Sequence, residues 1–153
     1  MKRWEDLPSE MQIEEIRQYY DVLDKKRGSL ALKRVFDIIL SSVLLLLLSP
    51  IILILSIAIK LDSRGPVFYR QERCTQYGRV FRIHKFRSMC DGADKKGSLV
   101  TVENDSRVTR VGKLVRKCRL DEIAQLIDVL KGDMTFVGVR PEVKKYVDAY
   151  KDE

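Results

Sequence analysis

The chain has 153 residues, of which 45% are hydrophobic and 33% are charged. This length is enough for one domain with a hydrophobic core, and the composition excludes a disordered chain. The three cysteines show no C-x-x-C spacing, so they indicate neither a disulfide framework nor a zinc site. Such cysteine usage fits a reducing cytosol.

The first predicted element is an amphipathic helix. From Pro8 to Lys26, apolar side chains recur near helical spacing, Pro8 and Ser9 are typical of a helix start, and Gly28 is typical of a helix end. We therefore expect residues 1–31 to form an N-terminal helix and a linker. The sequence does not decide whether this helix lies on a membrane surface or packs on the protein body.

The second predicted element is a membrane helix. Residues 38–59 contain no charged side chain, and these 22 residues would extend roughly 33 Å as a helix, about the thickness of the hydrocarbon core of a bilayer. The segment is not a signal peptide, because it begins far from the N-terminus and is too long for an apolar signal region. A straight membrane span is therefore possible.

Two features favour a helix that enters and leaves the membrane on the same side. Pro50 lies near the middle of the segment, where it removes a backbone donor and clashes with the Leu46 carbonyl. Ser49 beside it can donate its hydroxyl to an orphaned carbonyl. Basic residues flank both ends of the segment, and positive charge favours the cytosolic side. From the residues alone, a kinked span and a re-entrant hairpin broken at Ser49-Pro50 both remain open.

A basic region is predicted to follow the membrane segment. Residues 60–119 carry sixteen basic and six acidic side chains. Such a region suits anionic lipid headgroups, phosphates or nucleic acid, and a solvated surface would explain it equally well. Within it, the runs Val67 to Gln71 and Val80 to Phe86 are typical of strands and flank Gln76-Tyr77-Gly78, which indicates a β-hairpin.

Helices are expected in the second half of the chain. The stretches from Ser106 to Cys118 and from Asp121 to Leu130 each place apolar residues on one face, and Gly132 is expected to end the second helix. Thr135 to Val139 is expected to be a short strand or an extended run. The predicted fold class is therefore α+β and mostly helical, with a β-hairpin and amphipathic helices beside the membrane segment.

Asp121 and Glu122 are the candidate reactive residues. Capping and the helix dipole alone would explain acidic residues at the start of a helix. The same position also keeps a carboxylate ionised, as a nucleophile must be, and an adjacent Glu can hold Mg²⁺ together with substrate phosphates. With Arg116 just upstream, the pattern fits a metal-assisted phosphoryl transfer.

Three further cations are candidate substrate contacts. Lys85 and Arg87 follow one another at alternate positions of a predicted strand, so their side chains are expected to face the same side, toward a shared anion. Pro141 restricts the backbone of Arg140 to an extended conformation and so gives that side chain a fixed direction. A basic surface strand and an ordinary loop would explain these residues equally well.

These pieces belong to a longer series of short motifs in a specific order. The series consists of Lys33-Arg34-Val35-Phe36-Asp37, Ser49-Pro50, Gly65-Pro66-Val67-Phe68, Gln71-Glu72-Arg73, Lys85-Phe86-Arg87-Ser88-Met89, Asn104 to Lys113, Arg116 to Glu122, Leu130-Lys131-Gly132-Asp133-Met134 and Val137-Gly138-Val139-Arg140-Pro141. From about Leu32 to Glu142 the chain thus resembles the bacterial sugar transferase family, the monotopic polyprenyl-phosphate phosphoglycosyl transferases.

The resemblance implies a re-entrant membrane helix at residues 32–60 and a catalytic domain at residues 61–153, on the cytosolic face of the bacterial inner membrane. It implies transfer of a phospho-sugar from a UDP-sugar to polyprenyl (undecaprenyl) phosphate, the first membrane step of a bacterial surface glycan pathway such as exopolysaccharide biosynthesis. The sugar, the particular pathway and the oligomeric state are not predicted.

The resemblance also implies the roles of individual residues. Asp121 would be the nucleophile that forms a covalent aspartyl intermediate, and Glu122 would be the Mg²⁺ ligand. Lys85 and Arg116 would contact phosphate groups, and Arg140 would meet the nucleotide.

The chain departs from the family pattern at several places. Ala124 and Val139 stand where the family usually has Pro, and Asp128 stands where Asn is common. Family members usually continue beyond the position of Glu153, so the alternative expectation is a truncated, catalytically silent membrane-anchored homologue. A membrane-tethered nucleic-acid module fits less well, because stacking platforms need exposed aromatic residues among the cations, and no nucleic-acid partner is expected.

Overall fold

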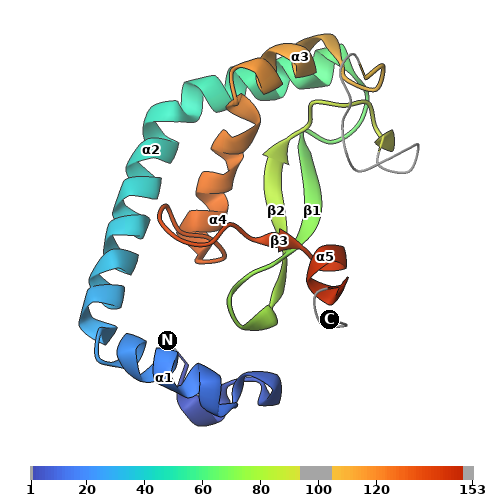
Figure 1. Ribbon diagram of the computed structural model, residues 1–153. Helices are drawn as coiled ribbons and strands as arrows, with labels where there is room; N and C mark the ends of the chain where they lie inside the picture. The colour runs from blue at the N-terminus through green and yellow to red at the C-terminus, as the bar shows by residue number, and fades with distance from the viewer. Residues whose placement is uncertain (1, 94–104, 150–153) are drawn as a thin grey trace.

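The structure, a computed structural model, describes residues 2–93 and 105–149 of the chain. It is mostly helical and contains one small sheet of three strands. Figure 1 shows a long helix, α2 (Arg27–Asp62), along one side and the top of the molecule, with the sheet on the inner side of its bend. The predicted α+β, mostly helical class is confirmed. Asn104, which begins one of the motifs, lies outside the described residues.

The N-terminal segment is less regular than its prediction. Its elements are the 3-10 helices η1 (Trp4–Asp6) and η2 (Ser9–Met11) and the helix α1 (Glu14–Asp24). The expected helix start at Pro8 is wrong, because the backbone of Ile13 is still extended and α1 begins after it. The rings of Trp4 and Tyr20 meet edge to face with centroids 5.1 Å apart, which packs η1 against α1.

Helix α2 contains the whole apolar segment. It continues without a break from Arg27 to Asp62 and includes Pro50. Within the described residues, α2 is the helix that is long and apolar enough, by length and composition, to cross a membrane, and most of its large hydrophobic side chains are exposed. Figure 1 shows that it bends between a part along one side and a part across the top. The helix is thus continuous rather than broken at Ser49-Pro50, and the re-entrant hairpin stays a prediction.

A hydroxyl compensates for the backbone bond that Pro50 cannot make. Pro50 has no N–H to donate to the carbonyl four residues earlier, that of Leu46. The hydroxyl of Ser49 donates to this carbonyl at 2.8 Å, as predicted. A polar group exposed to lipid would otherwise be unsatisfied, so this bond allows the helix to continue through the proline.

The sheet is built on the predicted hairpin. β1 (Phe68–Cys74) and β2 (Val80–Phe86) pair antiparallel, and β1 continues three residues beyond the predicted run. A third strand, β3 (Glu142–Val143), pairs with β1, which gives the strand order β2-β1-β3. Residues 135–139, expected to be a short strand or an extended run, form no strand. The strand in this part of the chain is β3, and helix α5 (Lys144–Ala149) follows it.

The first predicted helix of the second half begins later than expected. Helix α3 spans Arg110–Lys117, whereas the sequence pattern suggested Ser106 as its start. The side chain of Thr109 sets the start, because its hydroxyl oxygen accepts the backbone N–H of Gly112 at 3.0 Å and thus caps the helix. Before the cap, Val108 forms an antiparallel β-bridge with Met89.

The second predicted helix consists of two parts. The 3-10 helix η5 (Leu120–Gln125) is followed directly by helix α4 (Leu126–Lys131), so the acidic residues lie in a tighter helix than expected. Arg119 precedes η5 with a φ of 56°, a left-handed conformation that turns the chain between α3 and η5. As predicted, Gly132 ends α4, and its φ of 90° is one that glycine adopts readily.

A hydrophobic core joins the C-terminal part of α2 to the sheet. Its buried side chains are Leu55 and Ile59 from α2, Phe86 from β2, Val115 from α3 and Ala124 from η5. Since Ala124 and Phe86 belong to one cluster, η5 lies directly against β2. This packing brings the acidic residues of η5 beside the basic residues of β2.

The N-terminal part of α2 packs on α4. The guanidinium of Arg34 donates to the carbonyl oxygen of Val129 at 2.6 Å and to that of Leu130 at 2.7 Å. The last carbonyls of a helix have no partner within the helix, so Arg34 satisfies two groups at the end of α4. Both ends of the apolar segment therefore contact the same folded body.

Candidate active site

The candidate nucleophile lies just below the protein surface. Asp121 is in the first turn of η5, and 12% of its side chain is exposed. Glu122, the next residue, is more accessible, with 32% of its side chain exposed. The buried neighbour Ala124 fixes η5 on the core, so the backbone that carries the two carboxylates is held firmly.

Lys85 lies between the two carboxylates. Its ammonium nitrogen is 3.1 Å from Oδ2 of Asp121 and 3.8 Å from Oε1 of Glu122. Lys85 is the second-last residue of β2, the strand on which η5 packs. Two adjacent carboxylates repel each other, and a shared ammonium group between them reduces that repulsion. The structure thus brings together three of the residues that the sequence singled out.

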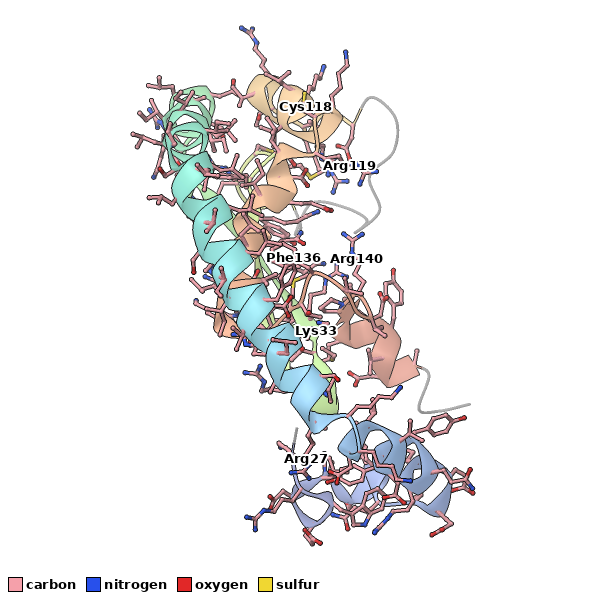
Figure 2. All side chains as sticks on the ribbon, turned by 90° about the vertical axis from the view of Figure 1, so that its left-hand side faces the viewer. Arg27, Lys33, Cys118, Arg119, Phe136 and Arg140 are labelled. Atoms are coloured by element: carbon pink, nitrogen blue, oxygen red, sulfur yellow. The ribbon has the colours of Figure 1, made fainter. Side chains whose placement is uncertain are left out.

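Arg140 completes the cluster from a distant part of the chain. Its guanidinium donates to Oε1 of Glu122 at 2.9 Å. Pro141, which follows, accepts a hydrogen bond through its carbonyl oxygen from Arg73 of β1 at 3.2 Å, and this fixes the end of the loop on the sheet. In Figure 2, Arg140 and Arg119 lie on the side of the molecule away from α2.

Arg116 lies on α3 and is oriented by Ser88 of the motif Lys85-Phe86-Arg87-Ser88-Met89. Its Nε donates to the hydroxyl oxygen of Ser88 at 3.0 Å. Hydrogen bonds from the side chain and backbone of Arg107 are the main cause that lowers the pKa of Asp105 to about 2, and the charge of Arg116 contributes to this shift. The region therefore contains an ionised carboxylate and several cations beside the start of α3.

Arg87 is not part of this cluster. It is buried, and its guanidinium donates to the carbonyl oxygen and the hydroxyl of Ser63 and to the carbonyl oxygen of Arg64. These groups follow the end of α2, so Arg87 fixes the exit of that helix. Lys85 and Arg87 diverge because β2 ends at Phe86, and strand alternation no longer sets the direction of the following side chain.

The sequence reasoning missed a buried pair that supports Lys85. The Asp128 carboxylate accepts the backbone N–H of His84 at 2.8 Å and lies 2.5 Å from Nδ1 of the same residue. Both residues are buried, so α4 and β2 are tied together one residue before Lys85. The sequence offered one weak signal for this pair, namely that Asp128 stands where Asn is common in the family.

The two carboxylates suit a magnesium ion whose remaining ligands come from the substrate and from water. Within the described ranges, no group of three or more His, Cys, Asp or Glu side chains could enclose a metal ion. Asp121 and Glu122 are adjacent, and Glu122 is partly exposed. Mg²⁺ commonly binds through one or two carboxylates, substrate phosphates and water. The donor set therefore suits Mg²⁺ in the presence of a phosphate-bearing substrate.

The chain is similar in sequence to known sugar transferases. A profile of the bacterial sugar transferase family matches residues 28–153. A UDP-N-acetylgalactosamine-undecaprenyl-phosphate N-acetylgalactosaminephosphotransferase of Aeromonas hydrophila is 45% identical over 122 residues, which are 80% of this chain and 29% of the relative. A putative undecaprenyl-phosphate N-acetylgalactosaminyl 1-phosphate transferase of Bacillus subtilis is 38% identical over 144 residues, 94% of this chain and 80% of the relative.

A third relative is named as an exopolysaccharide production protein. An exopolysaccharide production protein of Rhizobium leguminosarum is 46% identical over 112 residues, which are 72% of this chain and 56% of the relative. The chain thus spans less than two thirds of the length of the Aeromonas and Rhizobium relatives. The resemblance inferred from the order of the motifs is confirmed.

Proposed function

Because this chain belongs to the bacterial sugar transferase family, we propose that it transfers a sugar 1-phosphate from a UDP-sugar to polyprenyl phosphate at a membrane surface. The observation that carries the proposal is the cluster of Asp121, Glu122, Lys85 and Arg140, in which two carboxylates meet two cations near the surface. Phosphoryl transfer needs such positioned charges. The names of the Aeromonas and Bacillus relatives supply undecaprenyl phosphate as the acceptor and N-acetylgalactosamine as the sugar.

The proposed route has two steps with a covalent intermediate. A carboxylate oxygen of Asp121 attacks the β-phosphorus of the UDP-sugar, the bond from this phosphorus to the bridging oxygen breaks, and UMP leaves with that oxygen. A phosphate oxygen of the acceptor then attacks the same phosphorus, and the bond to Asp121 breaks. The product is a polyprenyl diphosphate sugar, and the carboxylate is regenerated.

The geometry supports Asp121 rather than Glu122 as the nucleophile. The Asp121 carboxylate is mostly covered and is ion-paired with Lys85, which gives it a fixed direction. Glu122 is more exposed and pairs with Arg140, whose side chain is itself 65% exposed, so Glu122 can exchange this partner for a cation that arrives with substrate. Mg²⁺ bound at Glu122 would neutralise the charge of the diphosphate.

The other cations have distinct proposed roles. Lys85 and Arg140 bind phosphate oxygens beside the reacting phosphorus, and Arg140 meets the nucleotide before UMP leaves. Arg116 is a second phosphate contact, which Ser88 orients. Arg87 supports the site indirectly. Its hydrogen bonds fix the residues that follow the end of α2, and these residues lead into the sheet.

We further propose that α2 enters and leaves the bilayer on the cytosolic face of the bacterial inner membrane. Arg34 contacts α4 before the apolar segment, and Leu55 and Ile59 near the end of that segment belong to the core of the same body. As a straight helix, the 22 uncharged residues 38–59 would place their two ends roughly 33 Å apart, on opposite sides of the hydrocarbon core. The bend of α2 in Figure 1 supports the hairpin instead.

The reaction is tested by measuring UMP release. Purified protein in liposomes is mixed with Mg²⁺, polyprenyl phosphate and a panel of UDP-sugars, and we expect UMP release that Asp121→Asn and chelation of Mg²⁺ abolish. Asp148→Asn, which changes an exposed carboxylate on α5, is the matched control and should keep the wild-type rate. Activity that survives Asp121→Asn would overturn the proposed nucleophile.

A second assay isolates the covalent step. Without polyprenyl phosphate, a covalent route exchanges labelled UMP into the UDP-sugar, because the first step is reversible. We expect this exchange in wild type and none in Asp121→Asn. If no UDP-sugar supports release or exchange, the chain is the catalytically silent membrane-anchored homologue.

A further inference from the structure

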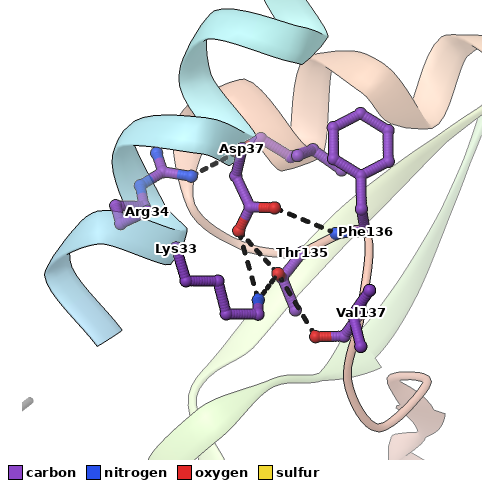
Figure 3. Close-up of polar contacts among 7 residues, drawn as sticks. Lys33, Arg34, Asp37, Thr135, Phe136 and Val137 are labelled. Carbon is purple, nitrogen blue, oxygen red and sulfur yellow. Dashed lines mark hydrogen bonds and ion pairs between the residues drawn. The ribbon is translucent and has the colours of Figure 1, made fainter. Parts of the chain in front are cut away.

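One loop is attached to α2 where the charged part of that helix ends. Asp37 is the last charged residue before the uncharged residues 38–59 and is itself buried. Its carboxylate accepts the hydroxyl of Thr135 at 2.6 Å and the backbone N–H of Phe136 at 3.4 Å. Lys33 reaches the same carboxylate at 3.3 Å and also contacts Thr135. Figure 3 shows these contacts, which hold the loop at the level where the membrane segment begins.

The residues that follow this attachment are apolar and exposed. We call Phe136, Val137, Gly138 and Val139 the apolar loop. The exposed fractions are 37% for Phe136, 74% for Val137 and 97% for Val139. In Figure 3, the ring of Phe136 lies on the side toward which α2 continues beyond Asp37. Exposed hydrophobic residues that adjoin a membrane boundary are suited to contact with lipid chains rather than with water.

The other end of the apolar loop reaches the candidate active site. Arg140 follows Val139 directly and donates to Glu122 at 2.9 Å. The loop therefore connects the membrane boundary at Asp37 to the acidic pair, and its side chains change from apolar to cationic along that path. This order matches an amphiphilic ligand whose hydrocarbon chain stays in the bilayer while its phosphate extends to the protein.

On the basis of the proposed function, we infer that the apolar loop binds the prenyl chain of the acceptor lipid and directs its phosphate to Arg140. The acceptor has the required chemistry, since it combines a long hydrocarbon chain with an anionic phosphate. In a two-step route, UMP has left before the acceptor reacts, so Arg140 can contact the nucleotide first and the acceptor phosphate afterwards. Phe136 and Val137 form the part of the path nearest the membrane, and Val139 the part nearest the phosphate.

Substrate-specific kinetics test this inference. Val137→Asn replaces an exposed apolar side chain by a polar one of similar size, and Val80→Asn makes the same change on an exposed residue at the start of β2, the matched control. For Val137→Asn we expect the KM for polyprenyl phosphate to rise by about tenfold. The KM for the UDP-sugar should stay within about twofold of wild type, and Val80→Asn should change neither constant.

The length of the acceptor's prenyl chain provides an internal check. A prenyl phosphate of very few isoprene units cannot reach back along the apolar loop into the bilayer, so Val137→Asn should affect its KM much less than that of the long acceptor. Equal increases in KM for both acceptors, or for acceptor and UDP-sugar, would overturn the inference. An identical effect of Val80→Asn would also overturn the inference, because Val80 lies on the β-hairpin and not on the apolar loop.

A measurement without turnover separates this inference from the proposed reaction. In a Trp4→Phe background, Val137→Trp and Val80→Trp each place one tryptophan on the surface, and its emission is followed in phosphatidylethanolamine liposomes. Addition of polyprenyl phosphate should give a saturable blue shift for Val137→Trp and none for Val80→Trp. The same result in a protein without transferase activity would support the lipid site while the proposed function fails.

The controls identify the ligand in that measurement. An equal blue shift with the same mole fraction of phosphatidylglycerol would assign the apolar loop to bulk anionic lipid and overturn the inference. Aqueous acrylamide quenches the emission of an exposed tryptophan. If liposomes and polyprenyl phosphate leave the quenching of Val137→Trp unchanged, the apolar loop faces water or another protein surface, and the inference is overturned.

Discussion

Gly112 lies so close to Ser88 that a Cβ atom on Gly112 would come within 1.9 Å of the Ser88 carbonyl oxygen. The contact is between α3 and the chain just after β2, and the backbone N–H of Thr109 donates to the same carbonyl at 3.1 Å. Only a glycine allows the helix to approach the backbone this closely. The approach brings Arg116, one turn later on α3, into hydrogen-bonding distance of the Ser88 hydroxyl.

Gly112→Ala is expected to destabilise the protein, although alanine has the higher helix propensity. The added methyl group would clash with backbone rather than with a flexible side chain, so α3 must shift, and overpacking of this kind costs typically about 1–3 kcal/mol. Gly28→Ala is the control, because a Cβ on Gly28 meets nothing within 4 Å. That change should be neutral or stabilising by up to about 1 kcal/mol. Thermal unfolding in detergent measures both, and a stabilised Gly112→Ala variant would refute the close contact.

Lys85→Met is expected to slow UMP release by about two to three orders of magnitude, as the loss of one group that stabilises developing charge does in other enzymes. The variant keeps the length of the side chain and removes the ammonium group that contacts Asp121 and Glu122. Lys85→Arg should retain part of the rate. Arg82→Met, which removes an exposed cation paired with Glu72 on the same strand pair, is the control and should have little effect. A fully active Lys85→Met variant would contradict the assigned role.

Asp37→Asn is expected to lower stability in a pH-dependent way. Burial alone would raise the pKa of Asp37, but hydrogen bonds from Thr135, Lys33 and the backbone of Phe136 outweigh it, so the pKa lies below the ordinary 3.8. The lowered pKa stabilises the folded state above the ordinary value, and this contribution is lost as pH falls through the folded-state pKa. Hydrogen bonds to a charged group are worth about 1.5–3 kcal/mol.

The measurement compares unfolding of wild type and Asp37→Asn at several pH values. The difference in unfolding free energy should be full near pH 7 and should shrink once the pH falls below 3.8. Asp148→Asn, which removes an exposed pair with Lys144, should change stability by less than about 1 kcal/mol at any pH. A difference for Asp37→Asn that is equally large at low pH would show that charge is not the cause.

Single cysteines placed at Leu30 and at Arg64, in a background without the native cysteines, report the topology of α2. If the helix is a hairpin, both positions are labelled by a membrane-impermeant reagent from the cytosolic side alone. The positions flank the uncharged residues 38–59, so a span would place them on opposite sides. A cysteine at Val80, on the folded body, provides the control for the cytosolic side, and labelling of Leu30→Cys and Arg64→Cys from opposite sides would exclude the hairpin.

The sequence predicted those features that depend on neighbouring residues. Three features of this kind are present in the structure: the uncharged run within α2, the paired strands β1 and β2, and Gly132 as the end of α4. The Ser49 hydroxyl bond to Leu46 was predictable for the same reason, because both groups lie on one helical turn beside Pro50. The order of the motifs was sufficient to identify the family, since each motif is contiguous.

The boundaries of several elements could not be predicted in this way. The sequence pattern placed the start of α3 at Ser106, but the Thr109 cap and the β-bridge between Val108 and Met89 place it later. Hydrophobic periodicity does not report a cap or a bridge to a distant residue. The same reason explains β3, a two-residue strand that exists only because it pairs with β1.

The residues of the candidate site show most clearly what the sequence determined and what the tertiary structure determined. The sequence by itself singled out Asp121, Glu122, Lys85 and Arg140 as candidates, because each belongs to a short motif of consecutive residues. Only the tertiary structure separated Lys85 from Arg87, sending the first to the acidic pair and the second to the end of α2. It also brought Asp37 to Phe136, 99 residues later. Such contacts depend on how helices and strands pack, and packing is a property of the whole chain rather than of any short stretch of it.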